Sequence, residues 1–423
     1  MPRLEILAGV PFDSGGSTFV APGLNEMVIY EAAPRLFAKS NSLNAIRARL
    51  GKISSLGVNV IWLMPIFSAS EVRSPKGSPY SMKDFMAIDP EYGTVDDLKD
   101  LVKEAHNRGM AVILDFVTNH TGADCSWVTE HKDWYMSEYT PTYTDAALFD
   151  WSNTTLQNQM IETMRYWINV ADIDGYRCDT ASPTREGGVT LGFWNKACAN
   201  LRNAFKKKNL ILLAESAKAD VLSNGFQLNY GWHYCEYLMD IFRGTKQTSE
   251  IFTINASEND IPAGTARMRF STNHDRSAQE NEYPGLVYGG SDAQIAAFAI
   301  AATMGGVPLI YSSQEIAYMQ RIPIFKSNAP LLDWNSGTDM TAEYRELTDI
   351  SKLPVMRKGS IAKISNQDVV SFVRTYGNEQ MLVVVNVRDR NVSFSVPETY
   401  KAKFDIPSYT LDAYDYLILP CRK

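Results

Sequence analysis

Four short motifs in this chain place polar side chains directly after apolar runs, where buried strands would end. The C-terminal ends of parallel strands meet at one face of a barrel, so these side chains are expected to lie together. Carboxylates, imidazoles and a guanidinium gathered in this way can transfer protons and stabilise charge. The residues are Asp115, Asn119 and His120 in LDFVTNH, Arg177 and Asp179 in GYRCD, Glu215 in LLAES, and His274 and Asp275 in FSTNHD.

Three of these acids, Asp179, Glu215 and Asp275, fit the cleavage of a glycosidic bond. In a retaining enzyme one carboxylate attacks the sugar carbon, a second acid protonates the leaving oxygen, and the two lie roughly 5 Å apart. Arg177 stands two residues before Asp179 on the same strand face and would keep that nucleophile ionised. Glu215 is expected to hold its proton, because burial or neighbouring negative charge raises the pKa of a carboxyl group.

A single acid at the end of a strand is more often a helix cap or a buried ion-pair partner than a catalyst. The convergence of three acids on one barrel mouth is what favours the catalytic interpretation. We interpret Asp115, the fourth acid of the motifs, as a hydrogen-bonding scaffold residue.

Eight short apolar runs alternate with longer stretches of helical period, which is typical of βαβ units around a parallel sheet. The interval from Asp179 to Glu215 is about one such unit, and that from Glu215 to Asp275 is about two. The pattern predicts an α/β fold, a closed (β/α)8 barrel of the TIM type. The candidate strands are residues 28–30, 58–63, 111–116, 173–176, 210–214, 238–242, 267–270 and 307–311.

Two predicted helices have clear ends. In TVDDLKDLVKEAHNRG, Thr94 and Asp97 form a capping-box pattern and Gly109 ends the helix. In SDAQIAAFAIAATMGG, Ser291 is the predicted cap and Gly305 the predicted stop.

The chain is predicted to contain three structural parts. Residues 1–118 and 151–357 would form the catalytic barrel, and residues 119–150 a short inserted domain after the third strand. From about residue 358 the pattern changes to alternating strands, as in DVVSFVRTYGNEQMLVVVNV, where two runs flank the turn-like YGNE. Residues 358–423 would therefore form a C-terminal antiparallel β-sandwich domain.

The four motifs resemble, in their order and on the expected strands, the four short regions of the α-amylase family of glycoside hydrolases. This resemblance covers nearly the whole chain. It implies that Asp179 is the nucleophile and Glu215 the general acid/base. It also implies that Asp275 grips ring hydroxyls and favours the distorted transition state.

The resemblance further implies a set of substrate-binding residues. His120 and His274 would hydrogen-bond the sugar in the subsite before the cleaved bond. Tyr80, in SPYSMKDF on the long loop after the second strand, matches the tyrosine that stacks against that sugar. Arg177 completes the set.

The resemblance also implies a calcium ion that would join the insert to the barrel. LFDWSN resembles the family's fifth region, so Asp150 would be one metal ligand and Asn119 its partner. Oxygen ligands of this kind suit calcium. Many members have a Lys-His pair after the second region that contacts substrate and metal, whereas this chain has Thr180, Ala181 and Ser182 after Asp179.

The expected activity is retaining hydrolysis of α-1,4-glucosidic bonds in starch, maltodextrins or related α-glucans through a covalent glycosyl-enzyme intermediate. An α-glucan transglycosylase or an α-1,6-acting relative would share that intermediate and differ in acceptor or linkage. A non-catalytic sugar-binding homologue would keep the barrel without the chemistry, and the intact Asp179, Glu215 and Asp275 argue against it.

The composition excludes several other classes of protein. The 423 residues are 45% hydrophobic and carry a net charge of -7, and no basic run exceeds Lys206 to Lys208, so no nucleic-acid partner is expected. The five cysteines show no CxxC pair and are expected to be buried free thiols. No membrane span, signal peptide or organic cofactor is expected. The sequence leaves the compartment open between the cytoplasm and a secreted or periplasmic location after removal of a signal.

Overall fold

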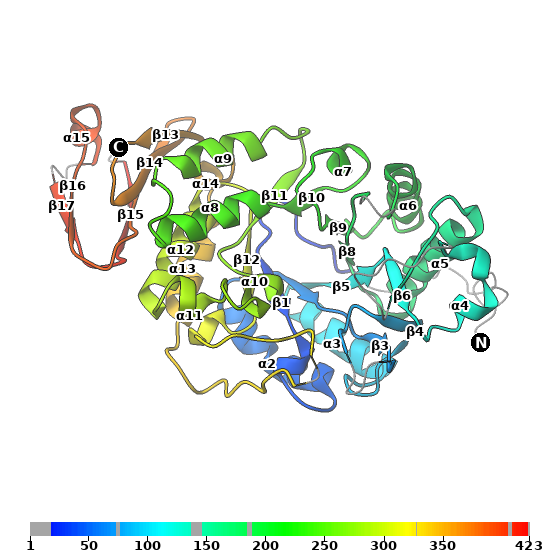
Figure 1. The fold of residues 1–423 in the computed structure, drawn as a ribbon. Coiled ribbons are helices and arrows are strands. Elements are labelled where there is room, and N and C mark those ends of the chain that lie inside the picture. The colour runs from blue at the N-terminus through cyan, green and yellow to red at the C-terminus, as the bar shows by residue number, and fades with distance from the viewer. Residues whose placement is uncertain are drawn as a thin grey trace.

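The core of the protein is a closed ring of eight parallel strands, in the order β1-β2-β5-β8-β9-β10-β11-β12 (Figure 1). This computed structural model describes residues 18–72, 77–136, 146–183, 188–326, 328–404 and 408–421. The strands are β1 (Ile29–Ala32), β2 (Val60–Leu63), β5 (Ala111–Val117), β8 (Gly175–Asp179), β9 (Ile211–Ala214), β10 (Leu228–Tyr230), β11 (Ala266–Arg269) and β12 (Val307–Tyr311). The predicted (β/α)8 barrel is confirmed.

The ring closes because β1 pairs on one edge with β2 and on the other with β12. Ile29 is the register partner of both Val60 and Leu309. Between β8 and β9 the backbones approach so closely that a Cβ atom on Gly175 would lie 1.8 Å from the Ile211 carbonyl oxygen. Only glycine, at φ +144°, fits the start of β8.

One predicted strand is wrong. Residues 238–242 belong to helix α8 (Trp232–Phe242), and the sixth strand is β10, which precedes it. The buried residues of α8 follow a helical period, as Tyr234, Leu238 and Ile241 illustrate. Strand β10 has only three residues, which is too short for an alternating apolar pattern to be recognised. The longer apolar run of α8 was therefore predicted as the strand.

The helices surround the ring (Figure 1). For two of them, α3 and α12, the sequence predicts the capping residues. Helix α3 begins at the predicted capping box, in which Thr94 Oγ1 accepts from Asp97 N at 3.2 Å and Asp97 Oδ2 from Thr94 N at 2.8 Å. Helix α12 is capped by Gly290 and not by Ser291, and it ends before Gly305 as predicted. The long helices are α2 (Ser42–Ser55), α3 (Val95–Asn107), α5 (Thr154–Ala171), α6 (Leu191–Ala204), α8, α9 (Glu250–Glu258), α12 (Ser291–Thr303) and α13 (Thr341–Ser351).

Short helices lie in the connections between these elements. They are η1 (Pro34–Leu36), α4 (Trp127–Glu130), η2 (Lys132–Trp134), α7 (Asp220–Ser223), α10 (His274–Ala278), α11 (Pro284–Val287), η3 (Gln314–Ile316), α14 (Pro354–Lys358) and α15 (Glu398–Phe404).

Two loops on the side of the candidate motifs carry small sheets. After β2, strands β3 (Phe67–Ala69) and β4 (Met82–Ile88) form an antiparallel pair. After β5, strands β6 (His120–Gly122) and β7 (Ala146–Leu148) form another, within the predicted insert. The proposed domain boundaries remain predictions.

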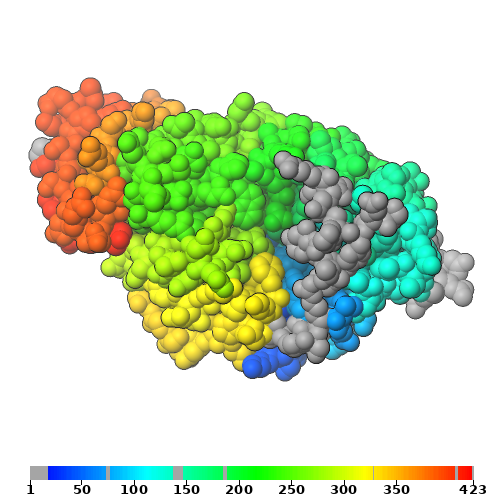
Figure 2. All heavy atoms as spheres, viewed as in Figure 1, coloured from blue at the N-terminus to red at the C-terminus, as the bar shows by residue number. Residues whose placement is uncertain are grey.

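Four antiparallel strands follow the barrel in the order β13-β14-β15-β18, beside a two-stranded sheet of β16 and β17. The predicted YGNE turn joins β14 to β15, where Tyr376 pairs with Glu379. Figure 2 shows this part, in orange and red, packed against one end of the barrel, where α12 and α14 contact β14 and β15. The strands are β13 (Ser360–Ile364), β14 (Val369–Tyr376), β15 (Glu379–Asn386), β16 (Val392–Ser395), β17 (Ser408–Leu411) and β18 (Tyr416–Pro420).

Four of the five free cysteines are buried, as predicted, and Cys421 is half-buried. A search of the described helices found none with the length and apolar character that crossing a membrane requires.

Candidate active site

A single guanidinium joins the acids at the C-terminal mouth of the barrel. Arg177 on β8 is fully buried, and its Nη1 lies 2.9 Å from Asp115 Oδ1 and 2.8 Å from Asp179 Oδ1. Its Nη2 lies 3.0 Å from Glu215 Oε1, directly after β9. Side chains from three adjacent strands therefore converge on one cation, at the barrel mouth where the sequence predicted that they would meet.

The pKa of Arg177 is raised well above its usual value, because the attraction of the Asp115 and Glu215 carboxylates outweighs the opposing effect of burial. The remaining faces of the guanidinium are also occupied. Its Nε donates to Tyr230 Oη at 3.0 Å, and the Trp62 ring centroid lies 5.1 Å from its Cζ. Arg177 is thus a fixed positive charge beneath the acids.

Asp115 connects this cation to the aromatic side of the site. Its carboxylate accepts from Trp62 Nε1 at 3.1 Å and from Tyr80 Oη at 3.0 Å, in addition to Arg177. Burial raises its pKa to about 6, and the charge of Arg177 limits that rise. These contacts agree with the predicted scaffold role.

Glu215 is the acid whose protonation differs most from that of an ordinary carboxyl group. Burial raises its pKa to about 8; Arg177 opposes the rise, and the negative charges of Asp179 and Asp275 add to it. The backbone N–H of Thr180 donates to its Oε2 at 2.7 Å and fixes its position. At neutral pH this side chain carries a proton that it can donate.

Thr180 holds an unusual backbone conformation beside the candidate nucleophile. Its φ is +45°, a region that β-branched residues rarely occupy. This turn aims its N–H at Glu215, while its Oγ1 donates to Asp179 Oδ2 at 3.1 Å. One strained residue therefore positions both acids.

His274 and Asp275 follow β11 and complete the mouth. His274 Nδ1 is hydrogen-bonded to Glu31 on β1, and its Nε2 lies 2.9 Å from Tyr80 Oη and 3.3 Å from Asp275 Oδ1. Burial opposes a charge on this imidazole, but Asp275 and Glu31 raise its pKa to about 9. His274 is therefore a cation at neutral pH, placed between two acids.

Tyr80, from the loop between β3 and β4, lies on the same side of the site. Its ring stacks on that of His274, with centroids 5.5 Å apart and planes 16° apart. The long loop after the second strand thus returns to the mouth.

The insert supplies His120, Asn119 and Asp150. His120 is the first residue of β6 and is half-buried, and Asn119 Nδ2 lies 3.5 Å from its Nδ1. The backbone N–H of Phe149 donates to the Asn119 carbonyl, which brings the predicted metal ligands into neighbouring segments.

The fit of calcium to this place can be judged from the oxygen atoms present. Asn119 Oδ1 is buried and has no hydrogen-bond partner among the described residues, which is compatible with a role as a metal ligand. The Asp150 carboxylate accepts from Ser152 N at 3.0 Å and Ser152 Oγ at 2.7 Å. Within the described ranges no three His, Cys, Asp or Glu side chains are grouped as metal ligands, so any further oxygens would come from amides, carbonyls or water.

Three contributors were not identified from the sequence. Glu31 ends an apolar run in VIYEA, the same signal that marked the other acids, and could have been found by it. Trp62 and Tyr230 look like ordinary strand residues in the sequence, and their contacts with the polar groups are visible only in the folded barrel.

A pocket of about 580 Å³ opens beside Glu215 and Asp275. One wall is Trp232, at the start of α8, and the Arg276 Cζ lies 4.9 Å from its ring centroid. Arg276 is held by Glu236 at 2.8 Å and Glu282 at 2.7 Å. Trp232 was not predicted as a site residue, because the strand wrongly predicted at 238–242 placed the end of the sixth strand after this tryptophan and not before it.

Comparison with known proteins was consistent with this geometry. Residues 33–146 match the family model described as alpha amylase, catalytic domain. The chain is 28% identical over 402 residues to Alpha-amylase 2 of Dictyoglomus thermophilum, a match that covers 87% of this chain and 68% of that protein.

Two solved structures extend the similarity to the fold. A noncanonic maltogenic alpha-amylase from Thermotoga neapolitana is 26% identical with a TM-score of 0.78, and the match covers 94% of this chain and 97% of that one. The alpha-amylase of Geobacillus thermoleovorans, solved in complex with acarbose, is 21% identical with a TM-score of 0.82, over 95% and 99% of the two chains. At 21% identity, the similarity to the Geobacillus thermoleovorans structure is evidence for the fold and not for the activity.

Proposed function

Because this chain belongs to the α-amylase family of glycoside hydrolases, we propose that it hydrolyses α-1,4-glucosidic bonds in starch, maltodextrins or related α-glucans. The proposed route is retaining and passes through a covalent glycosyl-enzyme intermediate. The observation that carries it is the pairing of Asp179, bound to a fixed cation, with Glu215, whose pKa of about 8 keeps it protonated.

In the first step the Asp179 carboxylate attacks the anomeric carbon and the glycosidic C–O bond breaks. Glu215 gives its proton to the departing oxygen, which leaves as a sugar hydroxyl. Arg177 Nη1 lies 2.8 Å from Asp179 Oδ1 and holds the attacking carboxylate in place. The products of this step are the shortened sugar and a glycosyl ester of Asp179.

The second step depends on a change in charge. Forming the ester removes the negative charge of Asp179, which is one of the causes of the raised pKa of Glu215. The pKa of Glu215 then falls and the group becomes a base. Glu215 takes a proton from water, the resulting hydroxide attacks the anomeric carbon, and Asp179 is released with net retention of configuration.

We assign the remaining predicted residues to binding the sugar. Asp275 would accept hydrogen bonds from ring hydroxyls. His274, kept cationic by Asp275 and Glu31, would donate to them, and His120 would hydrogen-bond the same sugar. Tyr80 would present its ring to the sugar before the cleaved bond.

We retain calcium as part of the proposal, with a structural role. Asn119 and Asp150 would hold the ion, which would tie β6 and β7 to the barrel mouth by its charge. No chemical step described above requires it.

A second candidate, transfer of the glycosyl group to another sugar, is favoured by one feature. Trp232 lines the same pocket as Glu215 and Asp275 and offers an aromatic surface there. A sugar stacked there could reach the intermediate before water does. Action on α-1,6 bonds would use the same acids and differ in the pose of the leaving sugar.

The deciding experiment compares wild type with Asp179→Asn on soluble starch, maltoheptaose and pullulan, with and without a calcium chelator. Release of reducing ends from starch and maltoheptaose, lost in the variant, is the expected result. Loss of activity on chelation would support the metal. Longer products without net release would favour transfer, and release from pullulan alone would favour α-1,6 action. Equal release by the variant would overturn the proposed role of Asp179.

A further inference from the structure

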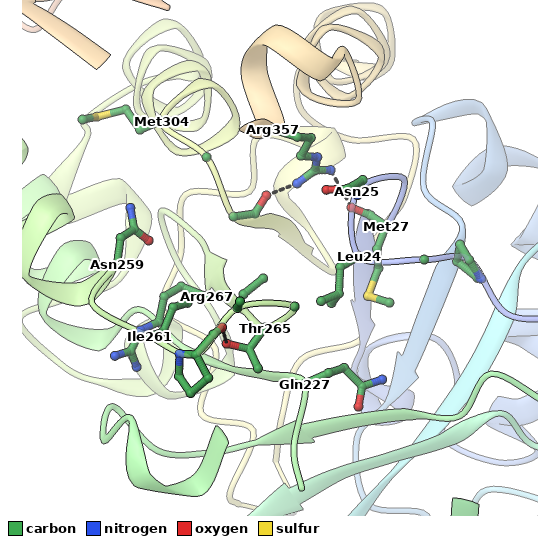
Figure 3. A pocket seen from close by; sticks show the side chains of 18 of the residues that line it. Leu24, Asn25, Met27, Gln227, Asn259, Ile261, Thr265, Arg267, Met304 and Arg357 are labelled. Atoms are coloured by element: carbon green, nitrogen blue, oxygen red, sulfur yellow. Dashed lines mark hydrogen bonds between the residues drawn. The ribbon is translucent and has the colours of Figure 1, made fainter. Parts of the chain in front are cut away.

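A second and larger cavity, of about 1140 Å³, lies at the opposite end of the barrel. Its walls include residues just before the strands begin, such as Met27, Gln227 and Thr265 (Figure 3). The other side is formed by Arg357 of α14 and Arg374 of β14. The cavity is therefore a boundary between the base of the barrel and the C-terminal sheet.

The charged residues that the structure describes along this cavity are all cations. They are Arg202, Lys206, Arg267, Arg357 and Arg374, and the described part of the lining contains no aspartate or glutamate. Such a concentration of positive charge is unexpected in a chain whose net charge is -7.

The guanidinium groups are held by neutral partners. Arg357 donates to the backbone carbonyls of Gly306 and Met27, the contacts drawn in Figure 3. Arg374 donates to the carbonyls of Val355 and Met356.

Arg202 and Arg267 are held in the same way. Arg202 bonds the Gly225 carbonyl and the Gln227 amide. Arg267 bonds the Glu258 and Ala217 carbonyls and the Asn229 amide. The nearby Glu258 carboxylate is taken by Arg269, which points elsewhere. Among the residues placed by the structure, none forms an ion pair with the four lining arginines.

Burying cations without a counter-charge is costly. Burial lowers the pKa of Arg357 to about 9 and that of Arg374 to about 10. Arg267 and Arg374 are only 3% and 2% exposed, and in their hydrogen bonds Arg267 uses Nε and Nη1 while Arg374 uses Nε and Nη2. Each keeps one terminal nitrogen that can donate to a ligand, and Arg357 Nε is buried and finds no hydrogen-bond partner in the part of the chain that the structure describes.

We propose that this cavity binds a phosphorylated small molecule, with the sugar-phosphate class as the best fit. Several guanidiniums without carboxylates match the two charges and three free oxygens of a phosphate monoester. The volume far exceeds that of an inorganic ion, and the amides of Asn25 and Asn259 beside Leu24 and Ile261 suit a small polar body. Bound phosphate would join cations of the barrel to cations of the C-terminal sheet.

The test uses the full chain and calorimetric titration at constant ionic strength, set with KCl. The probes are inorganic phosphate, glucose 6-phosphate and glucose. The matched variants are Ala256→Glu and Ala256→Gln, because Ala256 is an exposed residue of the rim and the two substitutions differ only in charge. Asp179→Asn controls for binding at the mouth.

Saturable binding of glucose 6-phosphate, tighter than that of inorganic phosphate, is expected. It should weaken about tenfold in Ala256→Glu and stay unchanged in Ala256→Gln and Asp179→Asn. Glucose binding that Ala256→Glu weakens would assign the cavity to neutral sugars and overturn the proposal. No saturable binding of either phosphate, or equal binding by the Glu and Gln variants, would also overturn it.

Discussion

The two ends of this barrel carry opposite charges on the same scaffold. At the mouth, Asp115, Asp179 and Glu215 surround one arginine, so the acids outnumber the cation. At the base, the cavity is lined by Arg357 and four other cations, with no acid among the lining residues that the structure describes. At the mouth, burial together with the negative charges of Asp179 and Asp275 raises the pKa of Glu215, and at the base burial lowers the pKa of Arg357.

The difference shows which positions set reactivity and which set stability. At the mouth the residues stand on strand ends and short turns, and their charges interact at 3 Å or less. At the base the close contacts are between backbones, as where a Cβ atom on Gly306 would lie 2.5 Å from the Arg267 carbonyl. Substitutions at the mouth should therefore change rates, and those at the base should change the free energy of unfolding.

The largest effect is expected from Asp179→Asn. Removing the nucleophile should lower kcat on maltoheptaose by on the order of 10⁴-fold, while the melting temperature changes little. Reducing-end assays and calorimetry measure the two quantities. A comparable fall in stability would break the distinction between the two ends.

Glu215→Gln should lower kcat on natural substrates by about 10² to 10⁴-fold. The loss should be much smaller on an aryl glycoside with an activated leaving group, which needs no proton. In wild type the activity should fall as the pH rises through about 8, where Glu215 loses its proton. That alkaline limb should be absent from the activity of the variant on the aryl glycoside, and its persistence would assign it to another group.

The same residue predicts a pH dependence of stability. The pKa of Glu215 is raised from 4.5 to about 8 on folding, so its folded form favours the proton. The stability that it contributes is present below pH 4.5 and is lost as the pH rises toward 8. Relative to wild type, Glu215→Gln should therefore gain melting temperature from pH 5 to pH 8, and a constant difference would contradict the assignment.

Substitution of two adjacent glycines tests whether close backbone contacts at the base of the barrel contribute to stability. Gly305 and Gly306 share a φ of +89°, but a Cβ on Gly306 would clash with the Arg267 carbonyl, whereas one on Gly305 would find its nearest atom at 3.7 Å. Gly305→Ala should cost about 1 to 2 kcal/mol and Gly306→Ala about 3 kcal/mol or more. Urea denaturation measures both, and equal losses would show that the close approach does not matter.

The smallest effect is expected at Trp232. Trp232→Ala should reduce kcat/KM on maltoheptaose about tenfold, while Trp232→Phe should keep most of the activity because it keeps an aromatic face. Unchanged kinetics in Trp232→Ala would show that the substrate does not contact Trp232.

Much of the mouth could be predicted because its signals are local. Asp179 and Glu215 each interrupt an apolar strand, and that contrast is visible in a few residues of sequence. Strand β10 could not be found, since three residues carry no period beside the longer apolar run of α8. The cluster of cations at the base of the barrel was not predicted for a different reason. Its cations come from α6, β11, α14 and β14, and only the folded chain gathers them.

Closure of the ring also bears on how the enzyme acquires its activity. Strand β1 must meet β12 across most of the chain, and Glu31 on β1 contacts His274 just after β11. Contacts of such high sequence separation form late and slowly, because a long loop must close before they stabilise anything. In a refolding experiment helical signal should return well before hydrolysis does, and hydrolysis should appear only when the two ends of the barrel have joined.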